Sequence, residues 1–309
     1  MRLLASLLLV FVLASAASAQ TPDWVTPMQG VHAQFTGSHG TVARFGDSIT
    51  VSMAFFTALN WIPAASTGDA SAAVAWVKGY VNTNPTPNNN CWSWQNDNQV
   101  VPTTGSDYVL KGAQGGTDSY WPVTVGDQDP TKSNIRHWLT DLNPEMAVIM
   151  WGSNDQTWNH GVTLANFTSN MRQVVQACKA NGTIPILTTP PPRRGYENGT
   201  LTSTSAKFAQ AVRDLAVAER VPYIDYYNEI MTRRPGMTWD GTLISSDGVH
   251  PSAGTNSFDA ATLNSYGYTL RNYATVKVMY DVYNQAIVPE PMTLGLLGVG
   301  GLALLRRRR

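Results

Sequence analysis

Cysteine is scarce in this chain, which has only Cys91 and Cys178 among its 309 residues. At most one disulfide can form, and an oxidising compartment would allow it. Cys178 falls on the apolar face of a helical pattern, which favours a buried free thiol instead. No spacing of cysteine and histidine indicates a metal site, and Asp127-Gln128-Asp129 is more typical of a polar turn than of a Ca²⁺ loop. We therefore expect neither a metal nor another cofactor.

The N-terminal segment has the layout of an export signal. MRLLASLLLVFVLASAASAQ contains one early positive charge, an apolar run and the small-residue site Ala17-Ser18-Ala19. This order predicts a secretory signal over residues 1–19 that signal peptidase cuts before Gln20. A buried N-terminal helix is the alternative.

A hydrophobic run long enough to span a bilayer is missing at the other end of the chain. VPEPMTLGLLGVGGLALLRRRR combines Pro289-Glu290-Pro291, an uncharged run over 292–305 and four arginines. Such a run rises about 21 Å as a helix, less than the roughly 30 Å of the hydrocarbon core. The order of the three parts resembles the PEP-CTERM sorting signal of Gram-negative bacteria. The resemblance implies that an exosortase-type protease removes residues 289–309 after transient membrane contact, with a permanent short anchor as the alternative.

An excess of one charge sign is missing too, since the chain has 21 basic and 21 acidic residues. Loss of Arg2 and Arg306–Arg309 together with Glu290 leaves 16 basic and 20 acidic residues over 20–288, a net charge of about −4. That segment has no basic cluster, and a mildly acidic protein has no general attraction to phosphate backbones. We therefore do not expect nucleic acid as a partner. The two terminal signals described above instead lead us to expect the protein at the cell surface, in the extracellular matrix or secreted.

Residues 20–288 are long enough for one α/β domain with a sizeable core. Thr163 and Ser205 indicate helix starts, and Asn181-Gly182 indicates a helix end. Strands are expected at 42–45, 108–110, 147–151, 184–188 and 223–225, and helices near 49–60, 132–141, 163–180, 204–219 and 258–287. This alternation predicts a parallel sheet with helices on both faces. Ligands in such folds bind beyond the carboxyl ends of the strands.

Residues 62–107 are longer than an ordinary connection between a strand and a helix. The stretch contains Trp92 and Trp94, whose rings are able to stack against sugars. It is either a lid or substrate wall, or a surface excursion held by its own aromatic side chains. The two interpretations stay open at this point.

A small hydroxyl lies where the first strand meets the first helical pattern, in VARFGDSITVS. Asp47 or Ser48 there is typical of a helix N-cap, because its side-chain oxygen accepts the free amide hydrogens of the first turn. The same turn is able to present Ser48 as a nucleophile, with those amides available to an oxyanion. The pattern alone favours the cap, so other motifs have to decide.

Three further motifs follow later strands or lie near the end of the chain. KGAQGGT allows a sharp turn and an exposed amide at Gly115, and WGSNDQT places the side-chain amide of Asn154 just past a strand. Each is typical of a plain turn when taken alone. In SSDGVHPS, Asp247 lies three residues before His250. That spacing allows Asp247 to orient the imidazole while His250 takes a proton from Ser48.

These four motifs, in this order, resemble the four sequence blocks of the SGNH, or GDSL-type, hydrolases and extend over most of residues 20–288. The resemblance implies a three-layer α/β/α fold with a five-stranded parallel sheet, similar to flavodoxin. It implies that Ser48 is the nucleophile, His250 the general base and Asp247 its orienting partner. The oxyanion donors it implies are the amides of Ser48 and Gly115 and the side chain of Asn154.

The chain departs from the family pattern in two places. Lys111 stands where many members have Asn, so the glycine role could shift from Gly115 to Gly116. The insertion over 62–107 makes the substrate pocket unlike that of compact members.

The sequence therefore predicts an exported, cofactor-independent esterase that works through an acyl-enzyme. An O-acylated carbohydrate is the favoured substrate, because TPPPRR and the tryptophan-bearing insertion offer polar and aromatic walls. Short-chain acyl esters and lipids remain open. The alternatives are an O-acetyltransferase that uses the same triad on a polysaccharide hydroxyl, and a surface or matrix protein that keeps the fold without turnover.

Overall fold

The computed structural model describes residues 21–52, 54–63, 67–81, 99–100, 109–110, 112–125, 130–157, 161–254 and 257–288. Both terminal signals, Cys91, Trp92, Trp94, Lys111 and the 127–129 turn lie outside this part of the chain. None of the described helices is long and apolar enough to cross a bilayer.

The main sheet consists of parallel strands in the order β1-β4-β5-β6. The strands are β1 (Val42–Gly46), β4 (Met146–Met150), β5 (Ile184–Thr188) and β6 (Tyr223–Ile224). Val42 pairs with Met146, and Met146 pairs with Ile184. Every residue of β1, β4 and β5 is buried, as expected for a sheet that helices cover on both faces. The predicted strands over 42–45, 147–151, 184–188 and 223–225 are confirmed to within one residue.

The predicted segment 108–110 does form a strand, but outside the main sheet. β3 (Val109–Leu110) pairs antiparallel with β2 (Gln99–Val100). The chain then reaches β1 through a single parallel bridge between Gly46 and Ala113. Gly112, at a φ of +89°, bends the backbone just before that bridge. The main sheet therefore has four strands among the described residues, where five were expected, within the predicted fold class.

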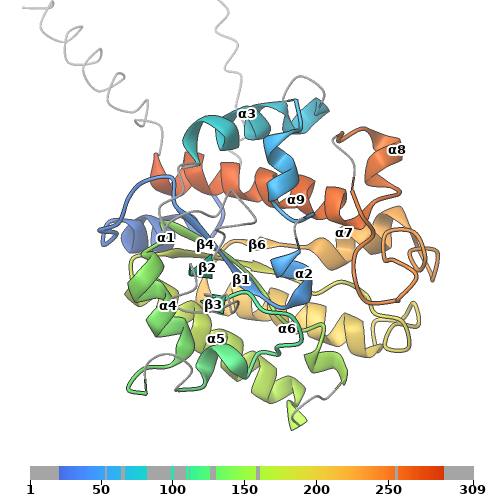
Figure 1. The fold of residues 1–309 in the computed structure, drawn as a ribbon, viewed down its shortest axis with the longest axis horizontal. Helices are drawn as coiled ribbons and strands as arrows, with labels where there is room; N and C mark the ends of the chain where they lie inside the picture. The colour runs from blue at the N-terminus through green and yellow to red at the C-terminus, as the bar shows by residue number, and fades with distance from the viewer. Residues whose placement is uncertain are drawn as a thin grey trace, which may run out of the picture.

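Helices form a layer on each face of this sheet (Figure 1). One layer contains α1 (Val25–His32), α3 (Ser71–Tyr80) and α9 (Gly267–Val282), which continues as a π-helical turn over Tyr283–Ile287. The other contains α4 (Asn134–Leu142), α5 (Leu164–Ala180) and α6 (Thr204–Glu219). The shorter helices are α2 (Ser48–Val51), α7 (Tyr226–Arg233) and α8 (Ala260–Leu263). The fold is thus a three-layer α/β/α sandwich of the flavodoxin-like type.

The helix signals were partly correct. The Thr163 side chain accepts from the Asn166 amide at 3.1 Å, and Asn181 caps the other end of α5 before Gly182 at a φ of +76°. The cap of α6, however, is Ser203 and not Ser205, because the Ser203 hydroxyl accepts from the Ala206 amide at 3.1 Å.

The pattern over 49–60 predicted a longer helix than the structure has. α2 ends at Val51, and Ser52 adopts an extended ψ of 136°. Asn272 of α9 then holds the chain in another course, accepting from the Phe56 amide at 2.8 Å and donating to the Ala54 carbonyl at 2.9 Å. Tertiary contacts therefore interrupt the helical pattern after one turn, and a 3₁₀-helical turn over Thr57–Asn60 follows.

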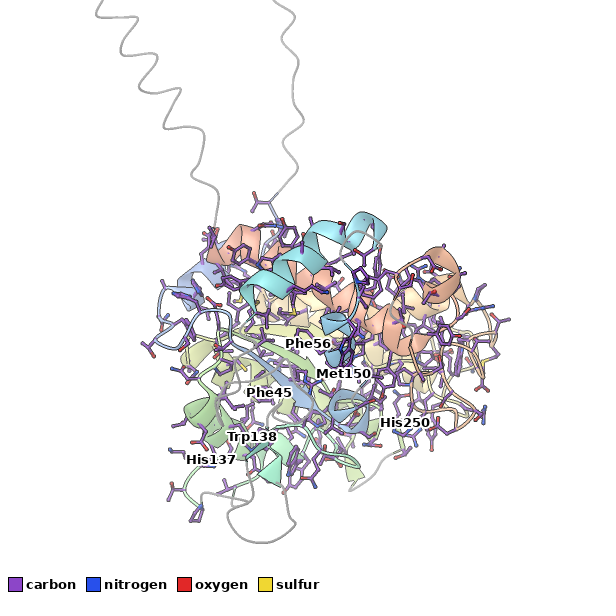
Figure 2. The ribbon with its side chains drawn as sticks, turned by 45° about the horizontal axis from the view of Figure 1, so that its top comes forward. Phe45, Phe56, His137, Trp138, Met150 and His250 are labelled. Atoms are coloured by element: carbon purple, nitrogen blue, oxygen red, sulfur yellow. The ribbon has the colours of Figure 1, made fainter. Side chains whose placement is uncertain are left out.

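The core runs along both faces of the sheet, with Phe45 and Met150 at the centre of the molecule (Figure 2). Cys178 is a free thiol buried in this core, as its position on the apolar face predicted. The described part of the 62–107 insertion includes α3, which packs against α9 in the helical layer.

Candidate active site

Ser48 is the first residue of α2 and follows the carboxyl end of β1. Asp47 supplies the cap, since its Oδ1 accepts from the Ile49 amide at 3.0 Å. The Ser48 hydroxyl is therefore not used as a cap. A side chain at Gly46 would collide with Thr50 Oγ1 and the Met150 carbonyl, so only glycine allows this tight turn.

His250 and Asp247 complete a row of three side chains with Ser48. The Ser48 Oγ lies 2.8 Å from His250 Nε2, and His250 Nδ1 lies 2.6 Å from Asp247 Oδ2. The structure thus brings together the three residues that the motifs singled out, although 202 positions separate the serine from the histidine.

The second oxygen of Asp247 is held by its own loop. Oδ1 accepts from the Ser245 hydroxyl at 2.8 Å and from the amides of Val249 and His250 at 2.8 and 2.9 Å. Burial alone would raise the pKa of Asp247, but the Val249 amide, the His250 ring and the other donors outweigh it and hold the pKa below its usual range. Asp247 is therefore a fixed, ionised partner for the imidazole across the neutral pH range.

Gly115 lies beside Ser48, because a Cβ built on it would be 3.7 Å from the Cβ of Ser48. Gly116, at a φ of +77°, turns the chain immediately afterwards. Among the described residues, neither the Ser48 amide nor the Gly115 amide donates a hydrogen bond. Two backbone donors are thus free next to the Ser48 hydroxyl.

Asn154 follows β4 and contacts the loop that contains Gly115 and Thr117. Its Nδ2 donates to the Thr117 carbonyl at 2.7 Å. This bond occupies one amide hydrogen and leaves the other available. The next residue, Asp155, is buried and accepts from the amide and hydroxyl of Ser119, which anchors the loop that contains Gly115.

Two buried arginines, which the sequence motifs did not indicate, support the segment that follows Ser48. Arg271 of α9 is fully buried and donates to the Ile49 carbonyl at 2.8 Å and to Thr50 Oγ1 at 3.1 Å. Its guanidinium lies 3.6 Å from the centroid of the Phe55 ring. Arg44 of β1 is also buried and donates to the Phe55 carbonyl at 2.7 Å. These contacts stabilise a helix of one turn, which would not be stable alone.

Arg194 belongs to the TPPPRR stretch that the sequence placed in a substrate wall, and in the structure it fixes the 245–250 loop. Its guanidinium makes a bidentate pair with Asp240, with both N–O distances at 2.7 Å, and donates to the Ser246 carbonyl at 2.9 Å. Its amide donates to the Gly248 carbonyl at 2.9 Å. The proximity of an arginine to this loop has no signature in sequence spacing.

Arg193 lies at the edge of the site. Its Nη1 donates to the Ser153 carbonyl, and its guanidinium stacks 5.5 Å from the centroid of the Tyr196 ring. Burial lowers the pKa of Arg193, while the nearby charges of Asp47 and Asp247 oppose this effect. A cation therefore stands next to the candidate triad.

Asp47, the residue directly before Ser48, is a buried acid. Burial raises its pKa to about 6, against the lowering effects of the Ile49 amide and of Arg271. Its Oδ2 is buried and has no hydrogen-bond partner among the described residues. The capping carboxyl thus titrates well above an ordinary aspartate.

Comparison with known proteins identifies a family for this chain. A model of the GDSL-like lipase/acylhydrolase family matches residues 45–256. No curated protein matches the chain.

Several solved structures are similar in fold. A lipase/acylhydrolase from Enterococcus faecalis is 17% identical, with 76% of this chain and 93% of that chain covered and a TM-score of 0.43. A GDSL-like lipase from Bacteroides thetaiotaomicron is 15% identical, with 85% and 98% covered and a TM-score of 0.43. A catalytic mutant of an acetylxylan esterase from Geobacillus stearothermophilus is 17% identical, with 79% and 96% covered and a TM-score of 0.43.

Proposed function

The chain belongs to the GDSL-like lipase/acylhydrolase family and is an ester-hydrolysing serine hydrolase, and we propose that Ser48, His250 and Asp247 are its catalytic residues. The observation that carries this assignment is the 2.8 Å contact between the Ser48 hydroxyl and His250 Nε2. With Nδ1 protonated toward Asp247, Nε2 has a free lone pair facing the hydroxyl.

The first half of the reaction forms an acyl-enzyme. His250 Nε2 takes the hydroxyl proton as Ser48 Oγ bonds to the acyl carbon, and the carbonyl electron pair moves to the oxygen. When the intermediate collapses, the ester's alcohol oxygen leaves and receives the proton from His250. Asp247 stabilises the imidazolium that exists between these two transfers. A water molecule activated by His250 then releases the acid and restores Ser48.

The oxyanion is stabilised by donors already in place. The free amides of Ser48 and Gly115 lie beside the nucleophile, and the second amide hydrogen of Asn154 is the third donor in this proposal. Donors fixed before the reaction cost no reorganisation when negative charge develops.

We propose that the substrate is an O-acylated carbohydrate. The site is open, since the side chains of His250 and Asp247 are 41% and 49% exposed. The charge of Arg193 is close enough to interact with Asp47 and Asp247, and its guanidinium stacks on the Tyr196 ring. We propose that this polar and aromatic pair contacts a hydroxyl-rich ligand. Trp92 and Trp94 extend this proposal to residues outside the described part of the chain.

The test uses two serines at opposite ends of α2. Ser48→Ala should abolish the release of acetate from acetylated glycans and labelling by a fluorophosphonate probe, whereas Ser52→Ala should keep both. Labelling of a residue other than Ser48 would overturn the assignment. Product analysis with a glycan acceptor tells hydrolysis from acyl transfer to a sugar hydroxyl, and long-chain esters test a lipase preference.

Export completes the proposal. The residues that motivate it are the signal-like segment before Gln20 and the Pro289-Glu290-Pro291 motif, which would be processed by signal peptidase and an exosortase-type protease. Intact-mass analysis of protein from the cell surface should give a chain from Gln20 to the Pro-Glu-Pro site. A chain that keeps Arg306–Arg309 would contradict removal of the tail.

A further inference from the structure

Glu145 is a fully buried carboxylate at the end of the sheet opposite Ser48. It directly precedes β4, whose other end leads to Asn154. The five residues of β4 alone extend about 16 Å, so this carboxylate is remote from the triad. The mechanism proposed above makes no use of it.

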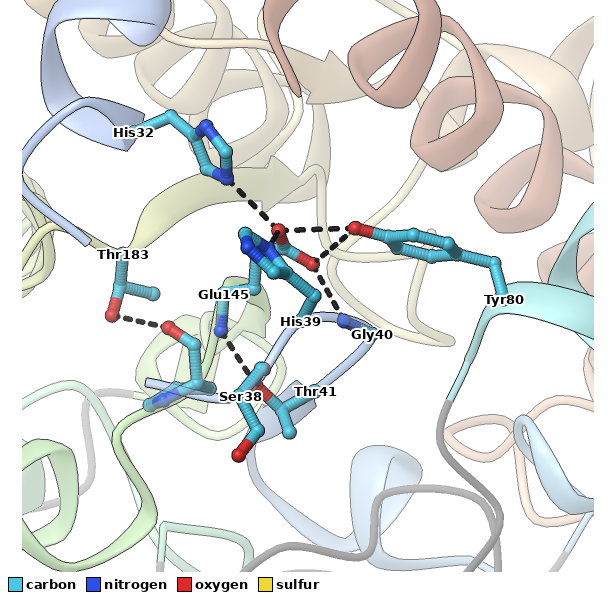
Figure 3. Close-up of polar contacts among 9 residues, drawn as sticks. His32, Ser38, His39, Gly40, Thr41, Tyr80, Glu145 and Thr183 are labelled. Carbon is cyan, nitrogen blue, oxygen red and sulfur yellow. Dashed lines mark hydrogen bonds and ion pairs between the residues drawn. The ribbon is translucent and has the colours of Figure 1, made fainter. Parts of the chain in front are cut away.

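Two imidazoles converge on one oxygen of this carboxylate (Figure 3). His32 Nε2 lies 2.9 Å and His39 Nδ1 lies 2.7 Å from Glu145 Oε1. The three potential ligand atoms all lie within 4.8 Å of one another. They come from the end of α1, from the loop before β1 and from the start of β4. The fold therefore gathers two nitrogens and one oxygen from three separate segments.

The other oxygen of Glu145 is held by two hydrogen-bond donors. Oε2 accepts from the Gly40 amide at 2.8 Å and from the Tyr80 hydroxyl at 2.9 Å, and the same hydroxyl lies 3.1 Å from Oε1. The Glu145 amide donates to the Thr41 carbonyl at 2.9 Å, which fixes the backbone. These bonds orient the carboxylate so that Oε1 faces the imidazoles, the supporting role that outer hydrogen bonds play around metal ligands.

A bound cation is one way to compensate this buried carboxylate. Among the described residues, the ion pairs of Glu145 are with His32 and His39, and no lysine or arginine pairs with it. A buried carboxylate is costly unless positive charge compensates it. A divalent metal held by His32, His39 and Glu145 would supply that charge.

We propose that His32 Nε2, His39 Nδ1 and Glu145 Oε1 form a Zn²⁺ site. Imidazole and carboxylate are ordinary zinc ligands, and three protein ligands with one water complete a tetrahedron. In such a site the ligand atoms stand about 3.4 Å apart, so the donors separate slightly from their present contacts. The His39 side chain is 69% exposed, which gives it room to move and gives the metal an entry path.

The bound metal joins α1 and the following loop to the amino end of β4. Binding to the folded chain and not to the unfolded chain raises stability by mass action. Its role is therefore structural and independent of the esterase assignment.

The binding test uses the full purified chain, freed of metal by a chelator and dialysed against Zn²⁺ or Co²⁺. The wild type should bind one equivalent, and Co²⁺ should give the visible spectrum of a tetrahedral site. His39→Ala should lose that equivalent, and because the residue is mostly exposed the variant should fold. The matched control is His137→Ala, which removes a histidine that pairs with Asp141 on α4 and should keep the metal.

Thermal unfolding distinguishes a metal site from a plain hydrogen-bonded cluster. At zinc about 100 times its Kd, the wild type and His137→Ala should melt about 5–10 °C higher than in chelator, and His39→Ala should show no such shift. Equal zinc binding by wild type and His39→Ala, or a wild-type Tm that zinc leaves unchanged, would overturn the site. Esterase activity is not the readout, so neither result depends on the role of Ser48.

Discussion

Carboxylate and imidazole meet at both ends of the sheet, with different consequences. At the carboxyl end, Asp247 binds one nitrogen of His250 and the other nitrogen faces the Ser48 hydroxyl. At the amino end, Glu145 binds two imidazoles on a single oxygen. A carboxylate–imidazole pair is thus not a catalytic unit by itself. The group that faces the remaining ring nitrogen decides what the pair does.

The two carboxylates also differ in how they are held. Asp247 is half exposed and takes its hydrogen bonds from residues 245–250 of its own loop. Glu145 is buried and takes its partners from segments more than 60 positions away along the chain. The first arrangement is a local device that positions one base, and the second is a long-range clamp on the fold.

The largest expected effect tests the proposed catalytic role of the Ser48 hydroxyl, which the Glu145 cluster lacks. Ser48→Ala and His250→Ala should each lower kcat/KM by about 10⁶-fold, and Asp247→Asn by about 10⁴-fold, because the base is still present. Steady-state kinetics with p-nitrophenyl acetate measures this, with circular dichroism to confirm the fold. A folded Ser48→Ala variant with wild-type activity would reduce Ser48 to the first residue of a helix.

The next effect concerns the oxyanion donors proposed beside Ser48. Asn154→Ala should lower kcat by about 10²- to 10³-fold with little change in KM, because its hydrogen bond strengthens as the oxyanion develops. Asn166→Ala, which truncates an exposed asparagine of α5, is the matched control. A rise in KM at constant kcat would instead mean that Asn154 binds the ground state.

A third prediction compares how buried Asp47 and half-exposed Asp247 make the free energy of unfolding depend on pH. The raised pKa of Asp47, about 6 against 3.8, means that the folded chain holds an extra proton between these values. This contribution to stability is complete below pH 4 and is lost as the pH rises through 6. Asparagine at this position cannot ionise. The difference in free energy of unfolding between Asp47→Asn and wild type should therefore rise by about 2 kcal/mol, in favour of the variant, from pH 4 to pH 7.

Urea unfolding at the two pH values measures this difference. The lowered pKa of Asp247 has the opposite sign, so its contribution is present above pH 4 and is lost as the pH falls toward its folded pKa. Identical pH dependence in wild type and Asp47→Asn would contradict the raised pKa of Asp47.

The smallest expected effect sharpens the view that the 245–250 loop is a positioned unit. Arg194→Lys loses the bidentate bond to Asp240 and should lower kcat about three- to tenfold through misplacement of His250. Arg213→Lys, which breaks a similar bidentate pair with Asp225, is the control. Equal losses in both variants would assign the effect to general stability.

Local patterns were sufficient for much of the fold. The alternation of apolar runs predicted β1, β4 and β5, and the rule that ligands lie at the carboxyl ends of strands placed Ser48 and Asn154 on one edge. The three-residue spacing of Asp247 and His250 was informative because their contact is made within one short loop.

Long-range contacts account for what the sequence could not predict. The helical pattern after Ser48 continued past Val51, whereas Asn272 of α9 and Arg44 of β1 hold the chain in another course. Burial of Arg44 and Arg271 runs against the usual location of charges, so hydropathy could not reveal it. The gathering of His32 and His39 on Glu145 also depends on tertiary structure, since 113 and 106 positions separate them from it.

The support that α9 gives to α2 also bears on biosynthesis. Arg271 reaches the Ile49 carbonyl across 222 positions, and His250 reaches Ser48 across 202. Contacts of such high order form late, because the intervening chain must first be made and closed into a loop. A nascent chain thus carries its serine without a base or a supporting arginine until almost the whole domain has left the ribosome. We therefore expect no esterase activity from the chain until synthesis of the domain is almost complete.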